Sequence, residues 1–249
     1  MSTLQKAFRI VEAVVGDQAR GMTFAEIVAA TGAPKASAHR ILKELVALRI
    51  LTFSAETARY RGSLKLANLG SEVTANFDLR TLVHPHLQAL HEETHHHAHM
   101  GIRDGDEGVY LDKIEAQDYG FKLFSAVGKR FPLHCTGMGK ALLAFGSEED
   151  RERVLSRPMD AITAKTIFDP QSLRAELADV REQGYALDRE EITRGVMCVA
   201  APIFGSPNDV VGAVSITFPS YINSDRGIDT EIAAILRYAS AISDALPKG

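Results

Sequence analysis

Hydrophobic residues recur at α-helical spacing through the first 48 positions of the chain and predict three short helices. The apolar face of the first helix holds Leu4, Ala7, Phe8, Val11, Val14 and Val15. Thr23 and Glu26 form a capping box that starts the second helix, Gly32 ends it, and Pro34 opens the third. The inner face of the third helix holds Ala38, Ile41, Leu42, Leu45 and Leu48, and its outer face holds Lys35, His39, Arg40 and Lys43. This pattern predicts a helix-turn-helix, although an ordinary helical hairpin with a solvated basic face has the same spacing.

A short β-hairpin is expected directly after the third helix. Residues 50–53 form an apolar strand, and a turn leads to a second strand in which Arg59 and Arg61 flank Tyr60. A helix-turn-helix followed by a basic hairpin is typical of a winged helix. We therefore assign residues 1–63 to a winged helix-turn-helix domain.

The rest of the chain predicts an α+β domain over residues 78–249, joined to the winged helix by a linker helix at residues 64–77. Helices are expected at residues 79–90 (broken or restarted near Pro85), 136–145, after Ser147, at 170–183 and at 228–246. Strands are expected at residues 97–103, 108–114, 121–127, 195–204 and 210–218. An antiparallel sheet flanked by helices accommodates this order.

Several motifs in the N-terminal half resemble those of the IclR family of bacterial transcription regulators. They are Thr23 to Ala30, Gly32 to Lys35, His39 to Leu42, Tyr60-Arg61 and Leu69-Gly70. Ala36 and Ala38 stand where family members usually carry a small hydroxyl residue and a β-branched residue, so the resemblance does not extend to the operator sequence. The resemblance implies a DNA-binding regulator, more often a repressor, that assembles as a homodimer or homotetramer.

The C-terminal half resembles the same family in three further motifs. They are Pro132 to Ala141, Asp188 to Glu191 with Gly195 to Ile203, and Gly212 to Ile216. In that family such residues build a GAF-like domain that binds a small effector, often a carboxylate-bearing metabolite such as a keto or sugar acid.

Charge distribution supports DNA binding at one end of the chain. Residues 1–65 carry ten Lys and Arg against five Asp and Glu, whereas the whole chain has a net charge of −4. Chance clustering is the alternative reading of this split. Our candidate DNA contacts are Thr23, Lys35, Ser37, His39, Arg40, Lys43, Arg59 and Arg61. The wing arginines are expected at phosphates, and paired heads would read half-sites about 34 Å apart.

A candidate effector site lies where a loop enters the helix at residues 136–145. Helix N-termini bind anions, and glycines there let a ligand approach the backbone. The candidate residues are Thr136, Gly137, Met138, Gly139, Asp188, Cys198, Ser215 and Thr217. One acid, one thiol and several hydroxyls suit a small hydroxy or oxo acid. Glycines needed only for the turn, and hydroxyls that face solvent, are the structural alternatives.

Seven of the nine histidines fall between His84 and His99, which raises a metal site as a minor hypothesis. Its candidate ligands are His95, His97 and His99, but no second cluster completes the set, so we expect no metal and no cofactor. Cys135 and Cys198 raise a redox-responsive regulator as another minor hypothesis. Because the chain has only two cysteines, we expect no disulfide framework, and a reducing cytoplasm is the expected location.

Other function classes receive little support from the sequence. No apolar run approaches the roughly 20 residues that span a bilayer, so no membrane partner is expected. An enzyme acting on a small acid through Cys198 or Asp188 is the main alternative, but no nucleophile–base motif or glycine-rich nucleotide loop occurs. A DNA-bound structural protein with a filled second domain is a third reading. We expect a regulator whose partners are operator DNA and a small organic acid, and not an enzyme.

Overall fold

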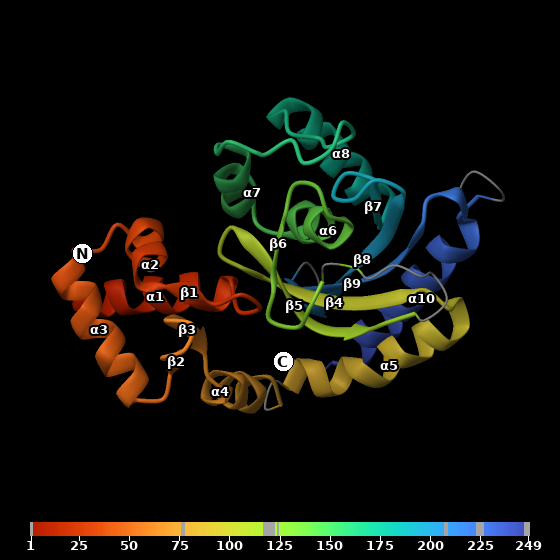
Figure 1. Ribbon diagram of the computed structural model, residues 1–249. Helices are drawn as coiled ribbons and strands as arrows, with labels where there is room; N and C mark the ends of the chain where they lie inside the picture. Colours follow the sequence, from red (N-terminus) through yellow and green to blue (C-terminus); the bar gives the residue numbers. More distant parts are fainter. Residues whose placement is uncertain are drawn as a thin grey trace. The chain divides into compact units, whose positions relative to one another are not determined.

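Two units follow each other along the chain, Met1–Ala75 and Asn76–Gly249, in the computed structural model (Figure 1). The structure describes residues 2–75, 78–116, 123, 125–206, 209–222 and 227–246. Each unit has its own hydrophobic core. No described helix meets the length and hydropathy that a membrane span requires.

The first unit combines a cluster of helices with a small sheet. Its helices are α1 (Thr3–Gly16), α2 (Phe24–Thr31), α3 (Lys35–Ala47) and the later α4 (Leu64–Ala75). Its strands are β1 (Met22–Thr23), β2 (Leu51–Ser54) and β3 (Arg59–Gly62), paired antiparallel in the order β1-β3-β2. Ile10 of α1, Ile27 of α2 and Leu42 of α3 are fully buried together. The predicted winged helix is confirmed.

The helix boundaries follow from local chemistry. The Thr23 hydroxyl accepts the Glu26 N–H at 3.3 Å, and the Glu26 carboxylate accepts the Thr23 N–H at 2.7 Å. This reciprocal capping satisfies two donors at the start of α2. Gly32 ends α2 in the left-handed region at φ 63°, which a residue without a Cβ adopts readily.

The second unit is built on one six-stranded antiparallel sheet in the order β6-β5-β4-β9-β8-β7. The strands are β4 (His97–Asp104), β5 (Glu107–Ile114), β6 (Arg130–Pro132), β7 (Ala186–Arg189), β8 (Val196–Ser206) and β9 (Asp209–Pro219). The helices are α5 (Asp78–Thr94), α6 (Gly137–Phe145), α7 (Glu148–Leu155), α8 (Pro170–Gln183) and α10 (Asp229–Ala245). The α+β class with an antiparallel sheet and flanking helices is confirmed.

Helices cover the two faces of this sheet differently. Helices α5 and α10 cover one face, where Val214 and Ile216 of β9 join the apolar core (Figure 1). Helices α6, α7 and α8 lie on the other face, where Ala186 and Ala200 pack beneath α6. Because side chains alternate along a strand, Ser215 and Thr217 of β9 face α6. The polar candidates therefore share one face.

Two predicted details of the second unit differ from the structure. Helix α5 continues through Pro85 without a break. Pro85 lies on the exposed side, where water can reach the carbonyl that loses its helical donor. The strand expected at residues 121–127 falls partly outside the described residues, and its described positions 123 and 125–127 form no strand. The edge strand is Arg130–Pro132 instead, paired with β5.

Candidate functional site

Helix α3 presents a basic surface to solvent. Lys35, His39, Arg40 and Lys43 are exposed, and Ser37 is half-buried. The Phe24 ring of α2 meets His39 edge-on, with 6.1 Å between centroids. Arg40 lies 3.8 Å from Glu44, one turn on, in a solvated pair that holds it weakly. Four exposed cationic or titratable side chains on one helix can contact phosphates and base edges.

The wing arginines have intramolecular partners. Arg59 Nη1 donates to the Gly21 carbonyl at 2.7 Å and lies 3.2 Å from Glu26. Arg61 Nη2 donates to the Arg20 carbonyl at 2.9 Å. Both side chains tie the hairpin to the turn before α2, so the structure gives them a role that the sequence alone did not indicate. The Thr23 hydroxyl is likewise engaged in the cap of α2.

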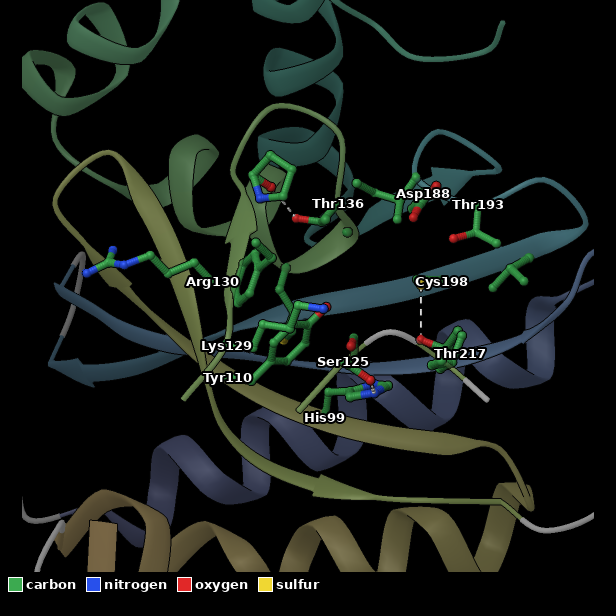
Figure 2. Close-up of a pocket in the computed structure, with 18 of the residues that line it drawn as sticks. His99, Tyr110, Ser125, Lys129, Arg130, Thr136, Asp188, Thr193, Cys198 and Thr217 are labelled. Atoms are coloured by element: carbon green, nitrogen blue, oxygen red, sulfur yellow. Dashed lines mark hydrogen bonds between the residues drawn. The ribbon is translucent and has the colours of Figure 1, made fainter. Parts of the chain in front are cut away.

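A cavity of about 470 Å³ opens on the α6 side of the sheet (Figure 2). Its lining includes seven of the eight effector-site candidates, namely Thr136, Gly137, Met138, Asp188, Cys198, Ser215 and Thr217. Gly139 is buried but does not line the cavity. A Cβ at Gly139 would approach the Leu133 backbone to 2.5 Å, so this glycine serves close packing.

Strand register brings these side chains together from distant parts of the sequence. Asp188 of β7 pairs with Cys198 of β8, which pairs with Thr217 of β9. Two residues along, Ser215 pairs with Ala200 on one side and His99 of β4 on the other. The Cys198 sulfur lies 3.0 Å from the Thr217 hydroxyl. A polar row thus crosses the sheet beneath the start of α6.

The first turn of α6 supplies donors above this row. The Thr136 hydroxyl accepts the Gly139 N–H at 3.0 Å and donates to the Pro132 carbonyl at 2.7 Å. Among the described residues, no acceptor is hydrogen-bonded to the N–H groups of Gly137 or Met138. Two backbone donors and the positive end of the helix dipole are therefore available to an anion.

Burial keeps several groups around the cavity uncharged near neutral pH. Burial, reinforced by Lys113 and His97, lowers the pKa of His99 to about 3, and His99 Nε2 lies 2.9 Å from the Ser125 hydroxyl. Burial raises the pKa of the Tyr110 hydroxyl and of the Cys198 thiol well above their usual ranges. Burial also raises the pKa of Asp188 to about 7, opposed by the hydrogen bond from the Glu191 N–H. His99, Tyr110 and Cys198 thus act as neutral donors and acceptors, whereas Asp188 changes its charge near neutral pH.

Several residues that line the cavity were not among the candidates predicted from the sequence. Tyr110, Ser125, Lys129, Arg130, Phe131 and Thr193 also line the cavity. Figure 2 shows Lys129 and Arg130 on one side of it and Asp188 and Thr193 on the other. Burial, with Lys113 nearby, lowers the pKa of Lys129. These residues reach the cavity only through the tertiary fold, and no sequence motif identifies them as a binding site.

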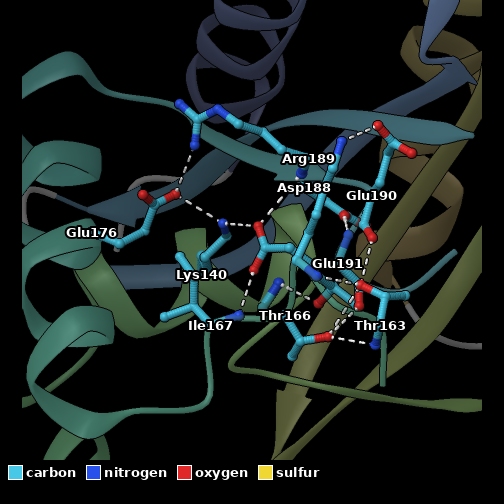
Figure 3. Close-up of polar contacts among 12 residues, drawn as sticks. Lys140, Thr163, Thr166, Ile167, Glu176, Asp188, Arg189, Glu190 and Glu191 are labelled. Carbon is cyan, nitrogen blue, oxygen red and sulfur yellow. Dashed lines mark hydrogen bonds and ion pairs between the residues drawn. The ribbon is translucent and has the colours of Figure 1, made fainter. Parts of the chain in front are cut away.

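A buried ion network lies behind Asp188 (Figure 3). Lys140 of α6 is fully buried, and its Nζ contacts Glu191 at 2.6 Å and Glu176 of α8 at 2.8 Å. The Glu191 N–H donates to Asp188 Oδ1 at 2.7 Å. The Thr166 hydroxyl donates to the Glu191 carbonyl at 2.7 Å, which fixes a loop whose Ile162 lines the cavity. Lys140 therefore supports the cavity wall without lining it.

The histidine and cysteine hypotheses receive no support from the geometry. Within the described residues, no group of three or more His, Cys, Asp or Glu is arranged to hold a metal. His95 is exposed after α5, His97 Nδ1 accepts the Ala116 N–H, and His99 faces Ser125. Burial raises the pKa of both the Cys135 and the Cys198 thiol, the opposite of what a reactive sensor cysteine requires.

The winged helix and the lined cavity of the second unit define a transcription regulator of the helix-turn-helix class. Residues 3–54 match the IclR helix-turn-helix domain model, and residues 71–244 match the model described as bacterial transcriptional regulator IclR C-terminal. The chain belongs to the IclR family of bacterial transcriptional regulators, as the sequence resemblance predicted.

Relatives and solved structures cover most of the chain. The HTH-type transcriptional regulator XynR of Escherichia coli (strain K12) is 33% identical over 218 residues, covering 87% of this chain and 86% of XynR. The DNA-binding transcriptional repressor YiaJ of the same organism is 27% identical over 247 residues, covering 98% of this chain and 87% of YiaJ. The crystal structure of an IclR homolog complexed with 4-hydroxybenzoate from Microbacterium hydrocarbonoxydans has TM-score 0.83 and 25% identity, covering 98% of this chain and 99% of that one. These relatives are named as regulators and not as enzymes.

Proposed function

We propose that the protein is a repressor whose binding to operator DNA is modulated by a small carboxylate-bearing metabolite held in the α6 cavity. One observation carries this proposal: free N–H groups of Gly137 and Met138 stand above a polar row of Asp188, Cys198 and Thr217. The repressor role follows the commoner family role and the printed name of YiaJ.

The cavity chemistry favours a small organic acid with a short apolar body. The helix N-terminus suits the carboxylate, and the hydroxyls of Thr193, Ser215 and Thr217 suit a keto or hydroxyl oxygen. Tyr110 and Phe131, whose ring centroids lie 4.7 Å apart, suit the apolar part. The aromatic acid bound by the solved homologue supports this class.

DNA binding would use the outer face of α3 in a homodimer or a dimer of dimers. Lys35, Ser37, His39, Arg40 and Lys43 remain our candidates, with Arg61 as a lesser contact from the wing. An acid that binds one conformation of the second unit better than another shifts the population of DNA-competent dimers by linkage.

The experiment pairs a thermal-shift screen with DNA binding by the full chain. A panel of keto, sugar and aromatic acids is screened, since a ligand at a hundredfold its dissociation constant stabilises by about 2.7 kcal/mol. Duplexes selected from a random library on the protein then report DNA affinity by fluorescence anisotropy, with and without the stabilising acid.

Matched variants separate the two sites. Arg40→Ala should abolish selected-duplex binding and keep the acid-induced shift, whereas Ser215→Ala should weaken the shift and keep DNA binding. Arg174→Ala, an exposed arginine of α8, controls for loss of positive charge. DNA binding that no acid alters would overturn the effector half of the proposal. Unchanged duplex binding by Arg40→Ala would overturn the assigned DNA surface.

A further inference from the structure

The start of α6 and the carboxyl group of Asp188 meet in one corner of the cavity. A Cβ placed on Gly137 would lie 3.1 Å from the Ala200 Cβ and 3.5 Å from the Cys198 Cβ, so this turn packs directly on β8. Asp188 is paired with Cys198 in the neighbouring strand and is 4% exposed. The donors that suit an anion and an acidic side chain therefore face the same small volume.

The groups packed around Asp188 leave its charge poorly compensated. Cys198 of β8, Tyr110 of β5 and Cys135 before α6 act on it as neutral groups. Its own loop contributes the Glu191 carboxylate, which disfavours the charge, and the backbone N–H groups of Glu191, at 2.7 Å, and Ile192, which favour it. Lys140 of α6 is the cation next to Asp188, but its ammonium group contacts Glu191 at 2.6 Å and Glu176 at 2.8 Å. The cations of the cavity lining, Lys129 and Arg130, lie on the side opposite Asp188 (Figure 2). Lys140 thus already neutralises part of the charge of two other carboxylates, so it stabilises an ionised Asp188 only weakly.

A ligand carboxylate in this corner would add another negative charge next to a carboxyl group that is 4% exposed. Two carboxylates that share a site cannot both remain ionised cheaply, and one of them retains a proton. Asp188 is the group whose environment already favours the neutral form, whereas the bound acid has the helix N–H groups to stabilise its charge.

We propose that the cavity binds its organic acid as an anion together with one proton on Asp188, which then donates a hydrogen bond to the ligand. Lys140 is the positioning residue, because through Glu191 it holds the N–H that orients the Asp188 carboxyl. The inference rests on the effector function proposed above and assigns Asp188 the role of donor. A pKa of about 7 for Asp188 in the free protein agrees with this arrangement.

Proton-linked binding has a distinct signature. Where free Asp188 is ionised, binding takes up close to one proton, so the association constant falls about tenfold for each unit of rising pH. Well below neutrality Asp188 already carries the proton, and the association constant becomes independent of pH. Binding to an ionised Asp188 would produce no proton uptake at any pH.

The first arm of the test needs no ligand. Infrared difference spectra of the full chain, wild type minus Asp188→Asn, are recorded on either side of neutral pH. The expected result is a carboxylic-acid carbonyl band that is present on the acid side and fades through neutrality. A carboxylate band on both sides of neutral pH would overturn the premise that the surroundings of Asp188 disfavour its charge, and with it the argument for the inference. The result of this experiment does not depend on the proposed regulator function.

The second arm measures proton uptake directly. Titration calorimetry of 4-hydroxybenzoate and of pyruvate in phosphate and in Tris buffer gives the number of protons taken up, which should approach one above neutral pH. Asp188→Asn should reduce this number to near zero and remove the pH dependence of affinity. Asp179→Asn, on the exposed face of α8, should behave as wild type.

The variants at Lys140 distinguish positioning from general stability. Lys140→Met should move the pH at which proton uptake appears, whereas a purely structural role would change affinity equally at all pH values. Binding of either acid without proton uptake in the wild type would overturn the inference while leaving the effector function intact. If neither acid binds, the infrared arm alone decides it.

Discussion

Replacing Lys140 by methionine should destabilise the second unit by about 4 kcal/mol, because it leaves a buried carboxylate without its cation. Glu191 is 2% exposed, and within the described residues the other two hydrogen bonds to its side-chain carboxylate, from backbone N–H groups, are long at 3.4 and 3.5 Å. Glu176 suffers less, since its side chain is 15% exposed and keeps Arg189 at 3.3 Å. The loss of stability therefore arises mainly at Glu191. Removing one partner of a buried ion pair costs roughly 3–5 kcal/mol.

Removing both charges should recover most of that loss. In the double variant Lys140→Met with Glu191→Gln, no uncompensated charge remains, and a neutral buried pair of similar volume is close to isoenergetic with an ion pair. Glu176→Gln is the matched control, because Lys140 then keeps Glu191. We expect this control to lose less than about 1 kcal/mol.

Urea unfolding of the full chain followed by circular dichroism measures these differences. With a slope of about 2 kcal/mol per molar urea, the single variant should lower the midpoint of the second unit by about 2 M. Hydrogen exchange of peptides from α6 locates the loss in that unit. A single variant that costs under about 1 kcal/mol, or a double variant no more stable than the single, would refute the reasoning.

Three further predictions concern other parts of the structure. Asp188→Asn should remove one part of the pH dependence of stability. A raised folded-state pKa means that the native protein keeps a proton that the unfolded chain has lost, so the contribution of Asp188 to stability falls by about 4 kcal/mol as pH rises from about 4 to about 7, and the difference between wild-type and variant denaturation midpoints across that window tests it. Thr23→Ala should destabilise the first unit by about 1 kcal/mol through loss of the α2 cap, with Thr57→Ala at the exposed hairpin turn as control; an unchanged melting temperature would contradict it. Gly108→Ala should displace the Phe131 ring, since the new Cβ would lie 2.0 Å from it, and a variant with unaltered stability and unaltered acid binding would show that the ring adapts freely.

Local signals in the sequence were sufficient for the first unit. The capping box at Thr23, the glycine stop at Gly32 and the proline before α3 act within a few residues of themselves, so the boundaries of α2 and α3 could be predicted. What the sequence did not indicate was that Arg59 and Arg61 bind the turn at Arg20-Gly21, because those contacts join residues about forty positions apart.

The second unit was predictable where alternation along a strand decides the outcome. Ser215 and Thr217 share a face because of the two-residue period, and the family motifs pointed to Thr136 and Asp188. The three-residue strand β6 and the burial of Lys140 were missed. So short a strand has little periodic signal, and a lysine on a helix is ordinarily solvated unless distant carboxylates such as Glu176 and Glu191 meet it.

The anchoring of the wing has a thermodynamic consequence for encounters with DNA. Arg59 and Arg61 surrender their rotational freedom when the domain folds, since both guanidinium groups are bonded to the backbone of a neighbouring turn. Ordering two such side chains at an interface would otherwise oppose association by about 0.5–1.5 kcal/mol each. If the hairpin contacts DNA as proposed, it would do so with both arginines already ordered, and the side-chain entropy lost on binding would come mainly from the exposed, solvated side chains of α3.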